Sequence, residues 1–200
     1  PRVECPKCKK PFRTQWAQTA LDLALPRGSA LSERFDSGRN FSNKLWNATR
    51  FVLMNLDGFS GGSLEMHEAP LEDRWLASRL ASVTRDVTAA IDDYRFAEAA
   101  RVLYGFVWDE FCSAYLELCK SRLADPASCH RVRTMLLVAL DTILRLLHPI
   151  MPFVTEEIWQ HLSVVVAKRR LPWDEDDQSA RSIMVAKWPT PPIEWIDSET

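Results

Sequence analysis

Residues 39–56 read RNFSNKLWNATRFVLMNL, and this stretch decides the fold. At about 100° per residue, its apolar residues fall on one face of an α-helix in the i, i+3, i+4 pattern of a core-packing helix. Those residues are Phe41, Leu45, Ala48, Val52 and Leu56. The pattern predicts one long amphipathic helix, with Ser32 as its N-cap and a stop at Asp57 and Gly58.

Cations and side-chain amides occupy the opposite face of this predicted helix. Arg39, Asn43, Asn47 and Arg50 fall within an arc of roughly 80° on the 3.6-residue period. Such a strip suits phosphate and ribose oxygens, which accept hydrogen bonds from guanidinium and amide groups. The same strip is also typical of the solvated back of an ordinary core helix. Periodicity alone leaves both interpretations open.

Two further helices are predicted between residues 70 and 123. The first begins at Pro70, an acceptable first-turn position, and turns Leu76, Leu80, Val83, Val87, Ile91 and Tyr94 inward. The second covers residues 96–123, with an inward stripe of Ala100, Leu103, Val107, Phe111, Ala114 and Leu118. Tyr104, Trp108 and Tyr115 broaden that stripe, and we interpret these aromatic residues as packing rather than as a base-stacking platform.

The last two predicted helices begin at clear signals. Asp125 and Pro126 form an N-cap and N1 pair, and Thr155 is expected to cap a fifth helix that buries Trp159 and Leu162. The fourth helix directs Val132, Met135 or Leu136, Ala139, Ile143 and Leu147 inward. Five helices with short connections predict an all-α protein, an antiparallel helix bundle.

The first segment of the chain has a different character. It reads VECPKCKKPF, and the spacing of Cys5 and Cys8 is that of two thiolate ligands in a zinc knuckle. A closed structural zinc site takes four ligands, so we expect a half-site whose other ligands lie upstream of Pro1. A reduced pair of exposed thiols without metal is the alternative. A short helix over residues 15–23 is also expected.

The closing segment SIMVAKWP, residues 182–189, has strand-like character, and a Pro-rich stretch follows it. Lys168, Arg169 and Arg170 precede an acidic run at 174–177, a combination typical of a solvated loop. The expected organisation is therefore an irregular zinc-knuckle-like segment at 1–29, a helical domain at 30–188 and a linker at 189–200.

Composition excludes several classes of protein. The formal net charge of −2 gives no bulk attraction to nucleic acid, so any RNA contact must come from a local strip. No apolar run approaches the roughly 20 residues that cross a bilayer. The five cysteines follow no disulfide-like pattern, which favours a reducing cytoplasm. No leader segment is visible, and we expect the chain to be a piece of a longer polypeptide.

No catalytic residues are predicted. The four histidines, at 67, 130, 148 and 161, are scattered without a partner at ligand or triad spacing. We expect His148 to cap the carbonyl groups of a helix end. Motifs for phosphate loops, dinucleotide binding, nucleophile elbows and zinc proteases are absent from the sequence.

Several stretches resemble, in the correct order, the helical anticodon-binding domain of valyl-tRNA synthetases, which are class I aminoacyl-tRNA synthetases. They are RNFSNKLWNATRFVLMNL, EDRWLASRL, YRFAEAARVLYGFVWDEFCSAYLELCK, LHPIMPFVTEEIWQHL and SIMVAKWP. The first of these is closer to the valyl enzymes than to the related isoleucyl, leucyl and methionyl enzymes. The CPKC segment departs from the family pattern, which runs into RNFxNKLWN without cysteines.

The resemblance implies a domain that grips the anticodon arm of tRNA. The joining of valine to tRNA, with its ATP and magnesium, belongs to a catalytic domain whose HIGH and KMSKS signatures are absent from this sequence, as is the editing domain. On this basis Arg39, Lys44 and Arg50 are expected to contact phosphates, and Asn43 and Asn47 to contact sugars or bases.

The expected partners are valine-specific tRNA and the rest of the synthetase chain, with no membrane, and the chain is expected to be a cytoplasmic monomer. Two alternatives stay open. One is the corresponding domain of an isoleucyl-type enzyme, and the other is a helical protein-interaction module whose strip meets an acidic partner.

Overall fold

The computed structural model describes residues 2–5, 7–14, 17–28, 33–62, 64, 66–169, 171 and 180–196. The chain divides into two compact units, Pro1–Asn40 and Phe41–Thr200. The division falls within the helix α2 (Glu33–Leu56). The domain boundaries expected from the sequence, after residues 29 and 188, stay predictions. The expected N-cap Ser32 lies outside the described residues.

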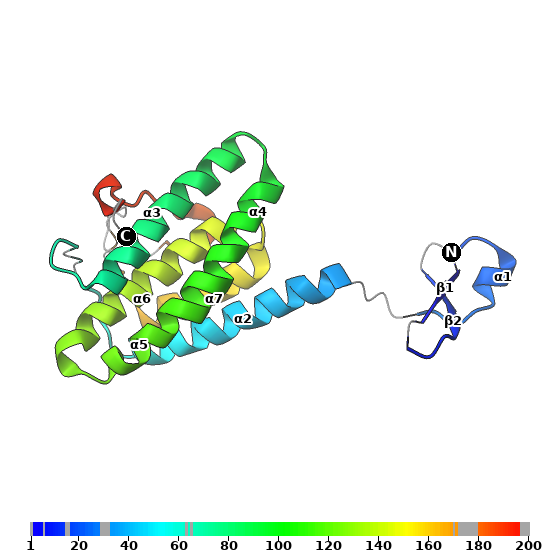
Figure 1. Ribbon diagram of the computed structural model, residues 1–200, viewed down its shortest axis with the longest axis horizontal. Helices are drawn as coiled ribbons and strands as arrows, with labels where there is room; N and C mark the ends of the chain where they lie inside the picture. The colour runs from blue at the N-terminus through cyan, green and yellow to red at the C-terminus, as the bar shows by residue number, and fades with distance from the viewer. Residues whose placement is uncertain are drawn as a thin grey trace. The chain divides into compact units, whose positions relative to one another are not determined.

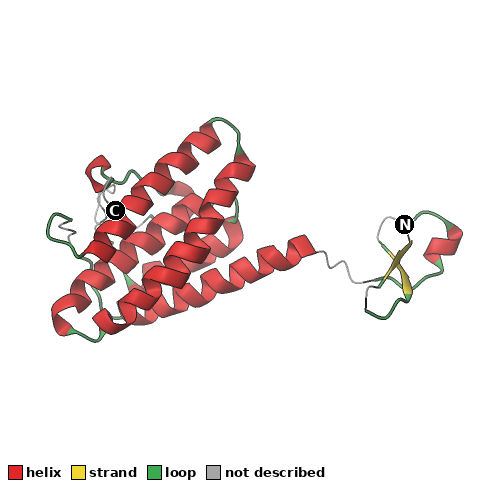
Figure 2. Cartoon of the chain, in the orientation of Figure 1, coloured by secondary structure: helices red, strands yellow, loops and turns green. Residues whose placement is uncertain are grey.

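The first unit contains a small hairpin. Strands β1 (Arg2–Glu4) and β2 (Pro11–Arg13) pair antiparallel, with Val3 opposite Phe12. Figure 2 shows these strands in yellow, and every other described element is helical. The helix expected over residues 15–23 is shorter, α1 (Ala20–Leu23), because the Thr19 side chain caps it by accepting the Asp22 N–H at 3.1 Å.

The second unit is a helix bundle, which confirms the predicted all-α class. After α2 come α3 (Leu71–Asp92), α4 (Phe96–Gly105), the π-helix η1 (Phe106–Tyr115), α5 (Leu116–Leu123), α6 (Pro126–Leu147) and α7 (Pro152–Val165). Two short 3-10 turns, η2 (Ile183–Val185) and η3 (Ile193–Trp195), follow. Figure 1 shows α3, α4 and α6 running side by side, and α3 packs on both α4 and α6.

Helix α6 lies at the centre of the core. Every residue from 134 to 147 is buried, so this helix is covered on all sides. The inward residues predicted for α6 are all buried, and so are all five predicted on α2. The α2 face joins the same core cluster as α6, which fixes the opposite face of α2 toward solvent. Gly58, at a φ of +68°, lies two residues after the end of α2, where the sequence predicted the stop.

The prediction that Tyr94 faces the core is wrong. Its side chain is 82% exposed and its φ is +59°. The Tyr94 N–H donates to the Ile91 carbonyl at 2.9 Å, and the Arg95 N–H donates to the Ala90 carbonyl at 2.7 Å. These two bonds form a Schellman motif that ends α3, with Tyr94 at the left-handed position where glycine is usual. Helix α3 therefore ends two residues before Tyr94, and its periodicity does not apply to that residue.

The helix predicted over residues 96–123 is present, but its middle third is the π-helix η1. In a π-helix the backbone hydrogen bonds join residues five apart, and each residue turns the helix by a smaller angle than in an α-helix. Residues four apart therefore remain on the same face along the whole of η1. The buried series is Leu103, Val107, Phe111, Tyr115 and Cys119. Leu118, predicted to be inside, is 49% exposed. A prediction based on the α-helical period therefore assigns the wrong residues to the buried face after Phe111.

The predicted start of the last helix is also wrong. Helix α7 begins three residues before the expected cap, with Pro152 in its first turn. The Thr155 hydroxyl instead donates within the helix to the Met151 carbonyl at 2.9 Å.

The segment 182–189 is not a strand, because side chains rather than a neighbouring strand hold it. The Ser182 hydroxyl accepts the Met184 N–H at 3.2 Å, and the Trp188 indole donates to the Thr88 hydroxyl at 2.8 Å.

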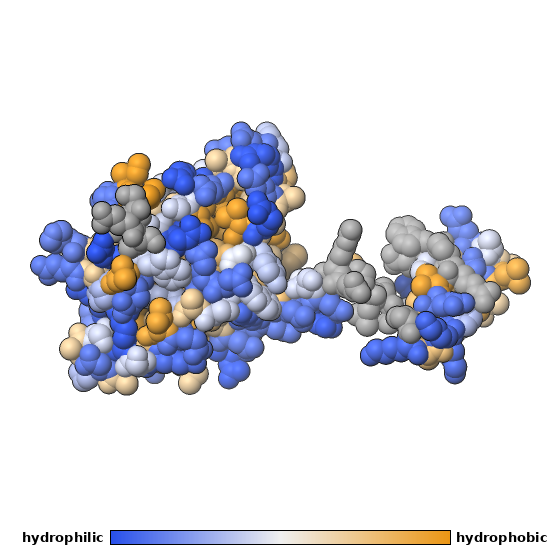
Figure 3. Space-filling view, in the orientation of Figure 1, coloured by the Kyte–Doolittle hydropathy of each residue, from blue (hydrophilic) through white to orange (hydrophobic). Residues whose placement is uncertain are grey.

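Exposed apolar residues are dispersed on the face drawn in Figure 3. There, hydrophilic residues cover most of the helix bundle, and apolar residues form small separate groups. Single exposed apolar side chains of this kind are normal for a folded protein. No described helix has the length and apolarity needed to cross a membrane.

Candidate nucleic-acid interface

The outer face of α2 carries an open row of polar side chains. Asn43, Asn47 and Arg50 are exposed, whereas Leu45, Ala48 and Thr49 between them are buried. None of the three side chains has a hydrogen bond or an ion pair with any residue that the structure describes. Two amides and a guanidinium are thus free to bind an external ligand that offers oxygen acceptors.

Arg39 belongs to the same helix and to the first unit. Its side chain is 60% exposed and forms an i,i+3 ion pair with Asp36 at 3.0 Å. An exposed pair of this kind is worth less than about 1 kcal/mol, because water screens it and both side chains lose freedom. A phosphate can therefore compete with Asp36 for the Arg39 guanidinium.

Lys44 lies on the flank of α2 rather than on its open face. Its ammonium donates to the Ser113 hydroxyl at 2.8 Å and lies 4.0 Å from the centre of the Trp108 ring. The Ser113 hydroxyl in turn donates to the Trp108 carbonyl at 2.8 Å. The structure therefore does not bring Lys44 together with Asn43, Asn47 and Arg50. A phosphate contact by Lys44 would require it to give up two contacts with η1.

The aromatic residues beside Lys44 form a closed stack. The Phe41 and Tyr104 rings are 5.1 Å apart, and the Tyr104 and Trp108 rings are 5.5 Å apart with 8° between their planes. Phe41 and Trp108 thus flank Tyr104, while Tyr104 and Lys44 flank Trp108. This geometry agrees with packing and disfavours base stacking, which needs an open ring face.

Cys5 and Cys8 flank the turn of the N-terminal hairpin, and both have free thiols. The backbone N–H groups of Cys8 and Lys7 stabilise the thiolate of Cys5 and lower the pKa of this group. A lowered pKa suits a metal ligand. Within the described residues, however, no three His, Cys, Asp or Glu side chains are placed to share a metal ion. These residues supply two of the four donors of a structural zinc site, and a complete site is not shown.

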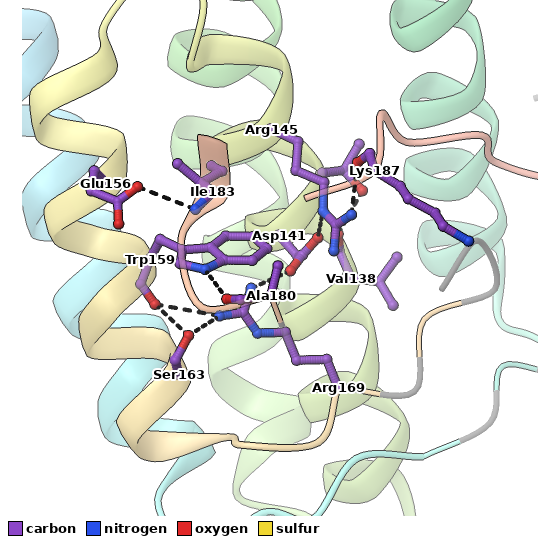
Figure 4. Close-up of polar contacts among 11 residues, drawn as sticks. Val138, Asp141, Arg145, Glu156, Trp159, Ser163, Arg169, Ala180, Ile183 and Lys187 are labelled. Atoms are coloured by element: carbon purple, nitrogen blue, oxygen red, sulfur yellow. Dashed lines mark hydrogen bonds and ion pairs between the residues drawn. The ribbon is translucent and has the colours of Figure 1, made fainter. Parts of the chain in front are cut away.

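A buried ion network, which sequence reasoning missed, lies between α6 and α7 (Figure 4). Asp141 accepts from Arg145 at 2.5 Å and also from Arg169, and all three side chains are buried. The Trp159 ring lies 5.0 Å from the Arg145 guanidinium carbon and 3.7 Å from that of Arg169. One carboxylate and one indole ring thus stabilise two buried cations.

This network fixes the chain after α7. The Arg145 guanidinium donates to the Lys187 carbonyl at 2.7 Å, and the Trp159 indole donates to the Ala180 carbonyl at 2.9 Å. The expected solvated loop is therefore wrong for Arg169, which pairs with Asp141; Arg170 and the acidic run lie outside the described residues. The available signal was Asp141 and Arg145, an i,i+4 charge pair inside an apolar helix.

A second buried group joins α3 to α5. Asp73 accepts from the Tyr115 hydroxyl at 2.7 Å and from Arg122 at 2.7 and 2.6 Å. Burial, reinforced by the negative charge of Asp73, raises the pKa of Tyr115 well above its ordinary value. The hydroxyl therefore stays protonated as a donor, and the group serves the scaffold that carries α2.

His148 is the C-cap residue of α6, and its backbone N–H donates to the Leu144 carbonyl, but its side chain does not cap the carbonyl groups as expected. Its ring nitrogens lie 2.8 Å from the Thr155 hydroxyl and 2.9 Å from the Met184 sulfur. The imidazole thus joins the start of α7 to η2.

Comparison with known proteins agrees with the resemblance seen in the sequence. The family model described as the anticodon-binding domain of tRNA ligase matches residues 73–200. A valine–tRNA ligase of Rhodopirellula baltica is 53% identical over 189 residues, covering 94% of this chain and 18% of that protein.

Two further relatives extend this agreement. The valine–tRNA ligase of Carboxydothermus hydrogenoformans is 49% identical over 78% of this chain and 16% of its own length. That of Bacillus subtilis is 41% identical over 84% of this chain and 18% of its own length. The chain thus spans less than a fifth of these curated relatives, and the predicted resemblance to the valyl enzymes is confirmed. With a family match over well more than half of its residues, the chain belongs to the anticodon-binding domains of tRNA ligases.

Proposed function

We propose that this chain is the domain of a valine–tRNA ligase that binds the anticodon arm of tRNA. The complete enzyme joins valine to its tRNA with ATP and magnesium, and that chemistry occurs in a part of the polypeptide outside these residues. The role of this chain is to bind and position the tRNA. Its proposed partners are valine tRNA and the rest of the ligase, and we propose that it is a monomer.

The open face of α2 is the observation that carries this proposal. Asn43, Asn47 and Arg50 are exposed, and they have no partner among the described residues. With a net charge of −2, the chain needs such a local row to bind RNA. In the proposal, Arg39 and Arg50 contact phosphates, while Asn43 and Asn47 contact sugars or base edges.

Replacing Arg39 and Arg50 together by Ala tests this assignment. Each lost phosphate contact lowers the slope of log K against log salt by about 0.7–0.9, so the double variant should lose roughly 1.4–1.8 of that slope. We expect tRNA affinity to fall roughly tenfold at constant folding, measured by filter binding between low and moderate salt. Arg85→Ala is the matched control, because Arg85 is equally exposed on α3 and pairs with Asp86. Equal slopes for the double variant and the unchanged chain would exclude the role of the two arginines.

Lys44 is tested separately, because its contacts are inside the protein. If Lys44 binds phosphate as the resemblance implies, Lys44→Ala will lower the salt slope by close to one. If Lys44 instead stabilises the fold through its contacts with Ser113 and Trp108, the same substitution will leave the salt slope unaltered. It will then lower the free energy of unfolding by about 1 kcal/mol.

The choice of tRNA tests the proposed specificity. We expect valine tRNA to bind more tightly than isoleucine tRNA and to compete better than heparin at equal charge. Tighter binding of isoleucine tRNA would assign the chain to an isoleucyl-type enzyme. Equal competition by heparin would favour a module for acidic partners. All five cysteines have free thiols, which supports our proposal of a cytoplasmic location.

We also propose that Cys5 and Cys8 supply two thiolates to a zinc ion whose other ligands come from the longer polypeptide. The hairpin turn and the lowered pKa of Cys5 support this assignment. Metal analysis of the complete ligase should find one zinc per chain, and Cys5→Ser with Cys8→Ser should remove it. Zinc retained by the double variant, or absent from the unchanged ligase, would exclude these ligands.

A further inference from the structure

A cluster of exposed apolar residues lies where the α6–α7 turn meets η2. We call it the apolar corner and define it as Ile150, Phe153, Met184 and Val185. Phe153 is 90% exposed, Met184 is 71% exposed and Val185 is 73% exposed. Phe153 and Met184 border the same shallow hollow of about 640 Å³. Two large apolar side chains beside one hollow, each with an exposed apolar residue close by in the sequence, are typical of an interaction surface rather than of scattered exposure.

The apolar corner is anchored from within the bundle. One oxygen of Glu156 accepts from the Ser182 hydroxyl at 2.9 Å and from the Ile183 N–H at 3.1 Å, the second of which is drawn in Figure 4. His148 contacts the Met184 sulfur at 2.9 Å. The backbone of η2 is therefore held by Glu156 of α7 and the Met184 side chain by His148 at the end of α6. A pre-formed apolar surface loses little conformational entropy when a partner covers it.

Charge around the apolar corner argues against RNA as the partner. Glu156 and Glu157 line the hollow. Burial opposes ionisation of Glu156, but bonds from Gln160, Ser182 and Ile183 outweigh it and lower its pKa. Carboxylates at the rim repel phosphates, whereas an apolar protein surface with a basic border would be complementary to both the corner and its rim.

We infer that the apolar corner docks on the part of the ligase polypeptide outside these residues, at an apolar patch bordered by Lys or Arg. The curated relatives are more than five times as long as the segment they share with this chain, so a large tethered partner accompanies the domain. Tethering raises the effective concentration of such a partner to about the millimolar range, at which a small apolar contact suffices. This inference rests on the proposed function and assigns the two surfaces different roles: α2 binds tRNA, and the corner holds the domain on the enzyme.

Hydroxyl-radical footprinting with peptide mass spectrometry tests the inference without tRNA. The rates of oxidation at Phe153 and Met184 are compared between the complete ligase and the 200-residue chain. We expect both rates to fall at least fivefold in the complete ligase. Tyr94, which is equally exposed at the α3–α4 turn, serves as the reference and should change less than twofold.

A second variant keeps the test independent of how the isolated chain behaves. In the complete ligase, Phe153→Ser should raise oxidation at Met184 severalfold, whereas the control Val164→Ser, at a residue 85% exposed on α7, should not. Equal rates in both proteins would overturn the inference. So would protection that appears only with added tRNA, or protection in the 200-residue chain that rises with its concentration. None of these outcomes bears on tRNA binding by α2, which the salt experiment measures.

Discussion

At the scale of single residues, backbone geometry and burial decide what a side chain does. Tyr94 is an aromatic residue in a left-handed conformation, and two hydrogen bonds of the α3 terminus hold it there. A bulky residue with positive φ carries backbone strain of about 1–2 kcal/mol. Its ring contacts only Phe96 among the described aromatic residues, so packing offsets little of this strain energy.

Tyr94→Gly should therefore stabilise the chain by about 0.5–1 kcal/mol, since glycine adopts this conformation without strain. Urea unfolding measures the difference. Tyr94→Ala is the control, because alanine keeps the Cβ atom and should give no gain. A loss of stability in Tyr94→Gly would mean that the exposed ring contributes more than the strain costs.

Two thiols, the half-buried Cys112 of η1 and the buried Cys119 of α5, predict a pH dependence. Burial raises the pKa of Cys112 to about 11 and that of Cys119 to about 12, from an ordinary value of 9.0. Above pH 9 the unfolded thiols lose protons that the folded thiols keep. The contribution of these thiols to the free energy of unfolding is therefore constant below pH 9, and it falls as the pH rises toward 11 by up to about 1.4 kcal/mol per unit for each thiol.

Urea unfolding at a series of pH values from 8 to 10.5 measures this slope. Replacing Cys112 and Cys119 by Ala should flatten it, whereas replacing the exposed Cys8 by Ala should not. An identical slope after both thiols are removed would assign the effect to other groups, among them Tyr115, whose raised pKa acts in the same direction.

At the scale of elements, the π-helix η1 determines which residues of the following helix α5 face the core. The wider turn keeps Tyr115 and Cys119 buried and leaves Leu118 at the surface. It also lets η1 contact two other helices, through Lys44 to Ser113 and through Arg79 to Glu110 at 2.7 Å. An uninterrupted α-helix would turn different residues toward these partners.

A pair of substitutions reports this phase. Cys119→Asp should cost several kcal/mol, because it buries an unpaired carboxylate, and Leu118→Asp should change stability by less than about 1 kcal/mol. Circular dichroism during thermal unfolding distinguishes the two variants. The reverse order would show that α5 has the α-helical phase expected from the sequence.

At the scale of the whole molecule, the network around Asp141 joins parts far apart in the chain. Asp141 and Arg145 come from α6, Arg169 follows α7, and the Arg145 guanidinium reaches the carbonyl of Lys187. Removing the single carboxylate leaves two buried guanidinium groups without their counter-ion. A buried pair broken in this way costs far more than an exposed pair.

Asp141→Asn should lower the free energy of unfolding by about 3–5 kcal/mol and expose residues 180–187 to proteolysis. Asp86→Asn is the matched control, because Asp86 pairs with Arg85 at the surface and its loss should change stability by less than about 1 kcal/mol. Equal effects of the two substitutions would show that the buried network contributes no more than a surface pair.

The sequence by itself determined the fold class, the helix order and the family. Apolar residues at three- and four-residue intervals specify which face of each helix is buried, and the inward residues predicted on α2 and α6 all proved buried. The same periodicity determined that Asn43, Asn47 and Arg50 face away from the core. Local chemistry was also sufficient for the start of α6, where the Asp125 side chain accepts the Ala127 N–H at 3.1 Å.

Only the tertiary structure decided the π-helix, the outward turn of Leu118, the inward position of Arg169 and the contacts of Lys44 with η1. Each depends on which helix lies opposite, and periodicity along one helix carries no such information. Arg169 is buried because Asp141, 28 residues earlier in the chain, offers it a carboxylate. The apolar corner likewise depends on Glu156 and His148, which hold η2 beside Phe153. Local sequence thus determines which face of a helix is buried, whereas contacts between residues far apart in the chain determine what that face packs against.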